Sequence, residues 1–209
     1  MTDVFGDTAA PCAALARKDL ILARALNAIG EPYIRKRTGG FEGLFRIITE
    51  QQVSVPSAAA VWARCQDAVG EATPEAVLAT GANRLGEAGL TRPKQRYVLT
   101  LASQFVEGDF HTDELLGLED AAAMKRLTEL LGIGPWTAAI YLLFCEGRID
   151  IWPPGDVALH NAFRAAMRKG PPPSLAEFDA RSDKWRPYRG LAAHILWNYH
   201  AHLRGRKPH

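Results

Sequence analysis

The sequence predicts an all-α protein, because apolar residues recur at helical spacing along almost all of its 209 residues. No stretch sustains the alternation of apolar and polar residues that is typical of β-strands. Helix-start signals recur along the chain. Thr73-Pro74 and Thr91 each precede an apolar-periodic segment, and Ser174 with Glu177 fits a capping box.

The expected helices follow one another with short connections. They are Ala14–Ile29, Phe41–Gln52, Pro56–Val69, Pro74–Ala79, Arg84–Glu87, Arg92–Glu107, Asp120–Leu131, Pro135–Glu146, Val157–Arg168, Leu175–Arg181 and Pro187–Leu203. Residues 1–12 are expected to form a flexible tail, and Gly170 to Pro173 a rigid spacer. Because no internal repeat or interdomain linker is present, we expect a single domain over residues 1–209.

Two glycines interrupt the helical pattern around position 133. Gly132 is typical of a helix C-terminus because it tolerates positive φ, and Pro135 suits the first position of the next helix. Gly132-Ile133-Gly134 therefore predicts a helical hairpin over residues 120–146. With no Cβ at either glycine, backbone N–H groups beside a helix N-terminus stay open to a phosphate. Taken alone, the motif is more typical of an ordinary αα-corner.

A lone carboxylate follows the hairpin. Asp156 ends a Pro- and Gly-rich segment, residues 147–156, and directly precedes an expected helix. In isolation this position indicates an N-cap residue. The dipole of the helix also favours its anion. Such a carboxylate could stabilise the positive charge that develops on a sugar when a glycosidic bond breaks, or activate the attacking water.

Three further segments accompany the hairpin and Asp156. They are IITEQQVS at 47–54, GLTRPKQR at 89–96, and WRPYR at 185–189 followed by Trp197. In this order, from about Phe41 to Tyr199, the chain resembles the helix-hairpin-helix glycosylase superfamily of base excision repair. Within it, the chain looks most like the DNA-3-methyladenine glycosylase II type. The resemblance implies two helical lobes with the active site in the cleft between them.

The resemblance also implies an activity. We expect a monofunctional DNA glycosylase that flips alkylated bases, of the 3-methyladenine and 7-methylguanine type, from duplex DNA and releases them by hydrolysis. Two alternatives remain open. One is a glycosylase of the same superfamily acting on deaminated or mismatched bases such as uracil or hypoxanthine. The other is a non-catalytic protein that binds DNA through the hairpin, although Asp156 in its expected loop argues against it.

Site residues follow from the motifs that match. Asp156 corresponds to the catalytic carboxylate, and Gln52 to the wedge that fills the gap left by the flipped base. A cationic base is attracted to aromatic faces, and the base-pocket candidates are Trp136, Trp197, Ile140, Trp152, Tyr33 and Phe45, with the core an equal alternative for Phe45. The DNA-binding candidates are Gln51, Gln52, Ser54, Gly132, Ile133, Gly134, Trp136, Thr137, Arg92, Lys94, Arg186 and Arg189.

Position 136 and the cysteines limit the chemistry. Lyase-competent relatives place a nucleophilic Lys where this chain has Trp136, so no imine intermediate is expected. Three scattered cysteines cannot form the four-cysteine iron–sulfur loop of some relatives. We expect no metal site and no cofactor, apart from a monovalent cation that the resemblance implies at the hairpin carbonyls. Ile140 replaces a Tyr of some relatives, which indicates a less aromatic base pocket.

The charge distribution favours a DNA partner. From Arg164 to the C-terminus the chain carries ten Lys or Arg and three acids, a formal charge of +7, whereas the preceding residues carry −5. Such asymmetry suggests a basic face for phosphates. No apolar run approaches the length of a membrane span, and the N-terminus does not resemble a secretory signal. We therefore expect a monomer in the cytoplasm, associated with a bacterial nucleoid.

Overall fold

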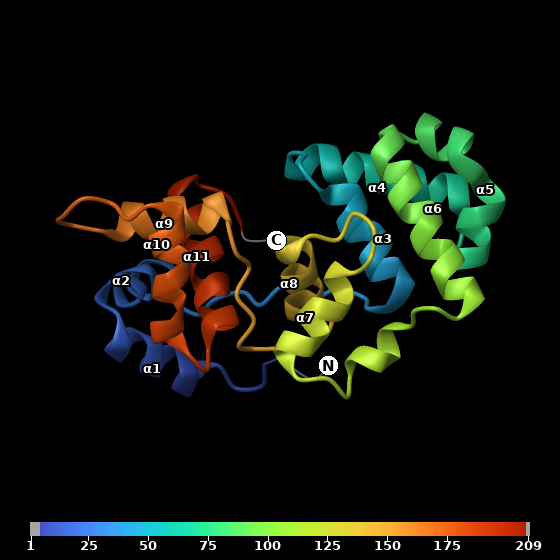
Figure 1. The fold of residues 1–209 in the computed structure, drawn as a ribbon. Coiled ribbons are helices and arrows are strands. Elements are labelled where there is room, and N and C mark those ends of the chain that lie inside the picture. The colour runs from blue at the N-terminus through green and yellow to red at the C-terminus, as the bar shows by residue number, and fades with distance from the viewer. Residues whose placement is uncertain (1–4, 208–209) are drawn as a thin grey trace. The chain divides into compact units, whose positions relative to one another are not determined.

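The structure is a computed structural model that describes residues 5–207, and it is helical throughout (Figure 1). The helices are α1 (Ala9–Lys18), α2 (Leu20–Ile29), α3 (Gly40–Glu50), α4 (Val55–Val69), α5 (Pro74–Glu87), α6 (Arg92–Glu107), η1 (Thr112–Leu115), α7 (Asp120–Thr128), α8 (Pro135–Phe144), α9 (Val157–Ala166), α10 (Leu175–Arg181), η2 (Ser182–Trp185) and α11 (Arg189–Leu203). Residues 5–207 contain no β-strand, so the predicted all-α class is confirmed. None of the helices in this range is long and apolar enough to span a bilayer.

The chain divides into two compact units. The terminal unit comprises Met1–Lys36 and Leu142–His209, and the middle unit comprises Arg37–Tyr141. Helices α1, α2, α9, α10 and α11 belong to the terminal unit, whereas α3 to α7 belong to the middle unit (Figure 1). The boundary falls inside α8, after Tyr141. The two helical lobes that the resemblance implies correspond to these two units, and the chain passes from the middle unit to the terminal unit within α8.

Helix α11 forms the centre of the terminal unit. Seven consecutive residues from Gly190 to Leu196 are buried, and they pack with α2 and α9 around Leu22 and Phe163. Gly190 allows α11 to lie close to the chain segment after α8. A Cβ at this position would lie 2.7 Å from the Ile149 carbonyl oxygen, which accepts the Gly190 N–H at 2.8 Å.

The middle unit packs its core on helix α3. Phe45 on α3 is fully buried, and its ring meets the Trp62 ring edge-on at 5.1 Å. Phe41 lies next to Phe45 at 6.0 Å and also contacts Phe105 of α6. Because Phe45 is enclosed by this cluster, the prediction that it lines a base pocket is wrong, and the core alternative is correct.

The predicted helix Ala14–Ile29 is two helices, α1 and α2, because Asp19 stops the first and caps the second. Its Oδ1 accepts the Ile21 N–H at 2.9 Å. Its Oδ2 accepts the Trp185 indole N–H at 3.1 Å and two bonds from the Arg181 guanidinium. Asp19 is buried, so its carboxylate needs hydrogen-bond donors, and Arg181 and Trp185 supply them. In this position Asp19 has an extended backbone, which ends α1 and lets its side chain cap α2.

Other element boundaries differ by a few residues. Helix α1 begins at Ala9, so the tail predicted over residues 1–12 is wrong for residues 9–12, and residues 1–4 lie outside the described part. Gly81, with φ 72°, interrupts α5 between the two segments predicted there. The ranges predicted for α6 and α10 are confirmed. The two helices of the hairpin and α9 end two or three residues earlier than predicted.

The hairpin between α7 and α8 depends on Gly132. This residue has φ 83°, a left-handed conformation that L side chains rarely adopt. A Cβ here would lie 2.4 Å from the Tyr97 ring of α6. The Tyr97 ring therefore packs directly on the backbone of Gly132, and this contact holds the turn against the core of the middle unit.

We expect Gly132→Ala to destabilise the protein by roughly 2–5 kcal/mol, because it adds left-handed strain and overpacks the Tyr97 ring. Chemical denaturation measures the change. Gly134→Ala is the matched control: no heavy atom lies within 4 Å of a Cβ built there, and its φ is not positive. An equal loss in both variants would contradict the account of Gly132.

Candidate functional site

Asp156 is held at both carboxylate oxygens. It is the N-cap of α9, where Oδ1 accepts the Leu159 N–H at 2.9 Å. Oδ2 accepts the Trp197 indole N–H at 3.3 Å from α11. The residue is 8% exposed, so its charge lies beside the surface with little water around it. An anion in such a position interacts more strongly with a nearby cation than an exposed one does.

Asp179 braces the loop that ends at Asp156. One carboxylate oxygen accepts the Trp152 indole N–H and the other accepts the Gly155 N–H, both at 2.9 Å. Trp152 also packs on Phe178 at 5.4 Å. Since Trp152 is buried and its polar atom is bonded to Asp179, the predicted base-pocket role is replaced by a structural one. Asp179 carried no sequence signal, because it lies inside an ordinary amphipathic helix.

A cluster of rings supports Trp197 from behind. Phe144 and His194 lie 5.4 Å and 5.7 Å from the Trp197 ring, both edge-on. Phe144 and His194 also contact each other, and Phe5 packs on His194. This cluster restricts the rotation of the indole, so its N–H stays directed at the Asp156 carboxylate.

His194 is a buried imidazole with an unsatisfied nitrogen. It is 1% exposed, and its Nε2 has no hydrogen-bond partner. Burial, with a smaller contribution from the positive charge of Arg35, lowers its pKa to about 3. His194 is therefore neutral near pH 7 and acts in this cluster as a ring, not as a charge.

Gln51 supports the hairpin from within the middle unit. Its Nε2 donates to the Gly132 carbonyl at 2.9 Å and to Thr137 Oγ1 at 3.0 Å. Thr137 and Ile133 are buried. Of the predicted DNA contacts, Gln51, Thr137 and Ile133 thus have their side chains turned to the protein, and only backbone groups of the turn remain for a phosphate.

Gln52 has an unusual backbone for its residue type. With φ 54°, it is the one non-glycine residue of positive φ in the described chain. Lys94 fixes the turn by donating to the carbonyls of Thr49 and Gln51 at 2.8 and 2.7 Å. Ser54 then caps α4. The turn presents the exposed side chain of Gln52 outward, and such strain at a turn often accompanies function.

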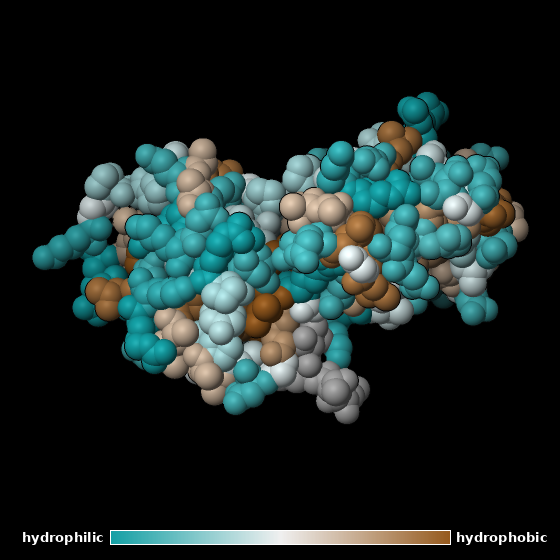
Figure 2. Space-filling model, turned by 60° about the horizontal axis from the view of Figure 1, so that its bottom comes forward, coloured by the Kyte–Doolittle hydropathy of each residue, from teal (hydrophilic) through white to brown (hydrophobic). Residues whose placement is uncertain are grey.

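The remaining base-pocket candidates differ in exposure. Trp136 and Tyr33 are 36% and 50% exposed, whereas Ile140 is buried in α8. Tyr33 is fixed by its backbone, because Asn198 accepts its N–H and donates to its carbonyl. Trp136, at the start of α8, and Tyr33 are therefore more exposed than Ile140. On the face shown in Figure 2, hydrophilic residues predominate and hydrophobic ones form small groups.

Two predicted phosphate contacts have internal partners. Lys94 is bonded to the carbonyl groups of the turn after α3, and burial lowers its pKa. Arg189 makes a two-point pair with Asp150 at 3.1 and 3.2 Å. For Lys94 and Arg189 the predicted phosphate contact is therefore replaced by a structural role. Arg186 pairs with Asp150 and Asp183 but is half exposed. Arg92 is exposed and stays a prediction.

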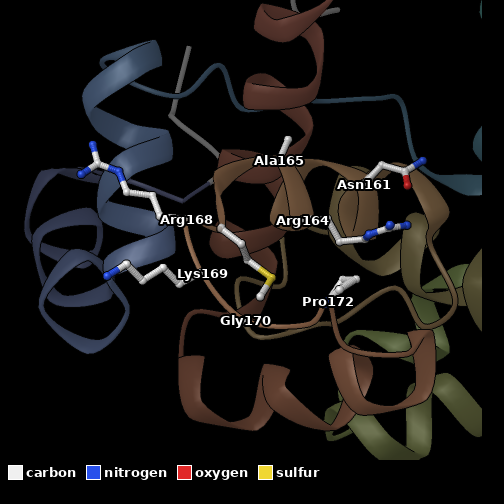
Figure 3. A pocket seen from close by; sticks show the side chains of 8 residues that line it. Asn161, Arg164, Ala165, Arg168, Lys169, Gly170 and Pro172 are labelled. Carbon is white, nitrogen blue, oxygen red and sulfur yellow. The ribbon is translucent and has the colours of Figure 1, made fainter.

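The cavity in Figure 3 is not the site of chemistry. It has a volume of about 620 Å³ and is lined by the second half of α9 and the segment after it. Asp156 lies at the opposite end of α9. Arg164 points to one side of the cavity, while Arg168 and Lys169 point to the other, so their charges do not converge (Figure 3). Within residues 5–207, no group of His, Cys, Asp or Glu is arranged to hold a metal ion.

The chain thus has a helical hairpin that turns at Gly132, and a loop after it that ends at the N-cap carboxylate Asp156. This order of features is shared by a class of protein. Residues 45–187 match the family described as HhH-GPD superfamily base excision DNA repair protein. The match covers more than half of the chain, which therefore belongs to this superfamily.

Two named proteins are similar in sequence to this chain. The chain is 28% identical over 162 residues to the putative DNA-3-methyladenine glycosylase YfjP of Bacillus subtilis, covering 74% of this chain and 56% of that protein. It is 26% identical to the alkylbase DNA glycosidase-like protein mag2 of Schizosaccharomyces pombe, covering 75% and 76%. The chain thus spans little more than half the length of YfjP.

Solved structures show the same fold. The structure of DNA-3-methyladenine glycosidase from Bacillus halodurans matches with a TM-score of 0.78 and 27% identity, over 96% of this chain and 94% of that one. Mag1, a 3-methyladenine DNA glycosylase from Schizosaccharomyces pombe in complex with abasic DNA, gives a TM-score of 0.82 at 23% identity, over 90% and 95%. The second likeness shows the fold alone.

The buried imidazole of His194 predicts a pH dependence of stability. Below pH 6.5 the unfolded chain binds a proton at this residue, whereas the folded protein does so only near pH 3. Its contribution is therefore present above pH 6.5 and is lost as the pH falls toward 3. Relative to wild type, we expect His194→Phe to gain about 1.4 kcal/mol of unfolding free energy per pH unit in this window. Denaturant titrations from pH 7 to 4 measure the difference, and a parallel pair of curves would contradict it. His202→Gln, at an exposed site, is the control.

Proposed function

We propose that this protein is a monofunctional DNA glycosylase that releases alkylated bases, of the 3-methyladenine and 7-methylguanine type, from duplex DNA by hydrolysis. The observation that carries the proposal is Asp156, a nearly buried carboxylate fixed at both oxygens in the loop after the hairpin. The superfamily and the names of the relatives support the substrate class.

The chemistry rests on charge. Cleavage of the bond between a base and C1′ develops positive charge on the sugar. Asp156 is preorganised to stabilise that charge, because the Leu159 N–H and the Trp197 indole hold its oxygens before the substrate arrives. The same carboxylate can orient or deprotonate the water that attacks C1′. With Trp136 in place of an amine nucleophile, water is the nucleophile and the strand is left intact.

His194 gives the leaving group little help. His194 is buried and neutral, and its pKa of about 3 makes it a poor proton donor near neutral pH. An enzyme without a strong general acid favours bases that leave readily. Purines alkylated at N3 or N7 already carry positive charge, and a cationic base is attracted to an exposed aromatic ring such as that of Tyr33.

The proposal also covers the oligomeric state, the location and the cofactors of the protein. It acts as a monomer on damaged double-stranded chromosomal DNA in a bacterial cytoplasm, with no organic cofactor or iron–sulfur cluster. A monovalent cation at the hairpin carbonyls would supply an additional positive charge for a phosphate, while the backbone N–H groups of the turn bind it directly.

Base release from methylated duplex DNA tests the proposal. Wild type is expected to release 3-methyladenine and 7-methylguanine without nicking the strand. Asp156→Asn is expected to lower the single-turnover rate by about 10²–10³-fold, because a neutral amide cannot stabilise the developing cation. Chromatography of free bases and a gel assay for nicking measure both outcomes.

Asp156→Asn is a suitable variant because the amide oxygen can still cap α9, so folding is retained. Equal rates for wild type and variant would sink the catalytic role of Asp156. Release of uracil or hypoxanthine in place of alkylated purines would move the substrate class to deaminated bases. Binding of DNA with no release of any base would leave a non-catalytic hairpin protein.

Gln52 is predicted to act as the wedge. We expect Gln52→Ala to slow release from a fully paired duplex about tenfold more than from a duplex with a mismatched lesion, where less stacking must be broken. Gln52→Gly is the companion variant: it lacks the side chain but relieves the positive φ. If insertion of the Gln52 side chain matters, the rate of base release falls equally in both variants. Retained activity in the Gly variant alone would assign the role to backbone conformation.

A further inference from the structure

The basic C-terminal part of the chain separates into paired and unpaired cations. Arg181 pairs with Asp19, Arg186 with Asp150 and Asp183, and Arg189 with Asp150. Arg164, Arg168, Arg204 and Arg206 are exposed and make no ion pair with any residue of the described chain. Much of the net charge of this segment is therefore concentrated at two places, the cavity beyond α9 and the end of α11.

The end of α11 lies on the Asp156 side of the terminal unit. Trp197 of α11 donates its indole N–H to Asp156. Arg204 follows Trp197 by seven residues, which is about 20° short of two full helical turns. Both residues thus lie along one stripe of α11, roughly 10 Å apart along the axis. His200, one turn after Trp197, lies between them on the same stripe.

The chain beyond α11 turns back on the helix. The N–H groups of Arg204 and Arg206 both donate to the Ala201 carbonyl at 3.0 Å. Gly205, with φ 61°, makes this return possible. The turn keeps the backbone of Arg206 at the end of α11 together with that of Arg204, and both side chains are exposed.

The electrostatics of His200 agree with this geometry. Burial is the largest cause that lowers its pKa, and the charges of Arg204 and Arg206 lower it further, whereas Asp156 opposes them. One imidazole therefore experiences the carboxylate and both arginines. The cavity beyond α9 is farther away: Arg164 follows the Asp156 cap by eight residues, about 12 Å along the α9 axis.

We propose that Arg204 and Arg206 form a phosphate-binding site for DNA beside Asp156, and that they bind the backbone next to the nucleotide whose base is released. The inference rests on the proposed function, since it takes DNA as the ligand. Arg suits this role because its guanidinium can bind two phosphate oxygens at once. Arg204 and Arg206 make no ion pair with any described residue, so without a bound phosphate they would leave an excess of positive charge near Asp156.

The alternative is a purely structural role. Basic residues at a helix C-terminus interact favourably with the helix dipole. Such a role would affect stability without affecting DNA. A test must therefore measure DNA binding and thermal unfolding in the same variants.

The test compares two pairs of arginines in the full-length protein. The probe is a duplex with a central abasic-site analogue, so binding does not depend on catalysis. Arg204→Gln/Arg206→Gln is expected to weaken binding about tenfold at 0.1 M salt and to lower the slope of log K against log salt by about 1.8, since each phosphate contact contributes about 0.9. Arg164→Gln/Arg168→Gln removes the same charge from the same unit and is expected to change affinity less than twofold.

Methylphosphonate substitution then locates the contact. Replacing a phosphate next to the abasic site by the neutral group should weaken binding by wild type but not by the Arg204→Gln/Arg206→Gln variant, because the two changes remove one shared interaction. Arg204→Lys/Arg206→Lys keeps the charge, so most of the affinity should return if the lost charge weakens binding in the Gln variant.

Three results would overturn the inference. They are an equal loss of affinity in both arginine pairs, no loss in either, or additive effects of the variant and the methylphosphonate. The proposed function is tested separately by base release from methylated DNA with wild type. Release by wild type with unchanged binding in the Arg204→Gln/Arg206→Gln variant would reject the arginine site alone. No release, with the binding differences present, would reject the glycosylase activity alone.

Discussion

The contact on which the site depends is the N-cap bond between Asp156 Oδ1 and the Leu159 N–H. It makes one carboxylate serve both the fold and the chemistry. As a cap, Asp156 satisfies an N–H group that α9 would otherwise leave without a partner. As an anion at a helix N-terminus, it is stabilised by the helix dipole. Folding of α9 therefore positions the charge before any substrate is bound, and no separate reorganisation is needed at the moment of bond cleavage.

The second oxygen connects this cap to the centre of the terminal unit. Trp197 bonds it from α11, and the rings of Phe144 and His194 hold Trp197 in place. Since Gly190 lets α11 approach the segment after α8, a single missing Cβ also bears on the position of the indole. The Leu159 N–H and the Trp197 indole therefore orient the carboxylate, and packing around Trp197 fixes the second of these donors.

The features that local sequence signals control were predictable. Gly132 and Pro135 marked the hairpin, and Asp156 was identified both as a cap and as the candidate carboxylate, since each signal lies within a few residues of the element it controls. The partners of buried polar groups were not predictable, because they are distant in sequence. Asp19 meets Trp185, which lies 166 residues later, and this contact splits a helix that periodicity alone predicts as continuous. Trp152 similarly looked like a pocket residue until its bond to Asp179 was known.

The cations illustrate the same limit with a functional consequence. From the sequence, Lys94 and Arg189 looked like phosphate ligands because they lie in matching motifs, but Lys94 caps the turn after α3 and Arg189 is paired with Asp150. A charge with an internal partner has already been partly neutralised, and an incoming phosphate must compete with that partner. The tail residues Arg204 and Arg206 carried no motif, yet they are exposed and without an ion pair in residues 5–207. Which cations can bind DNA is therefore decided by pairing within the fold, and net charge along the sequence gives only an upper bound.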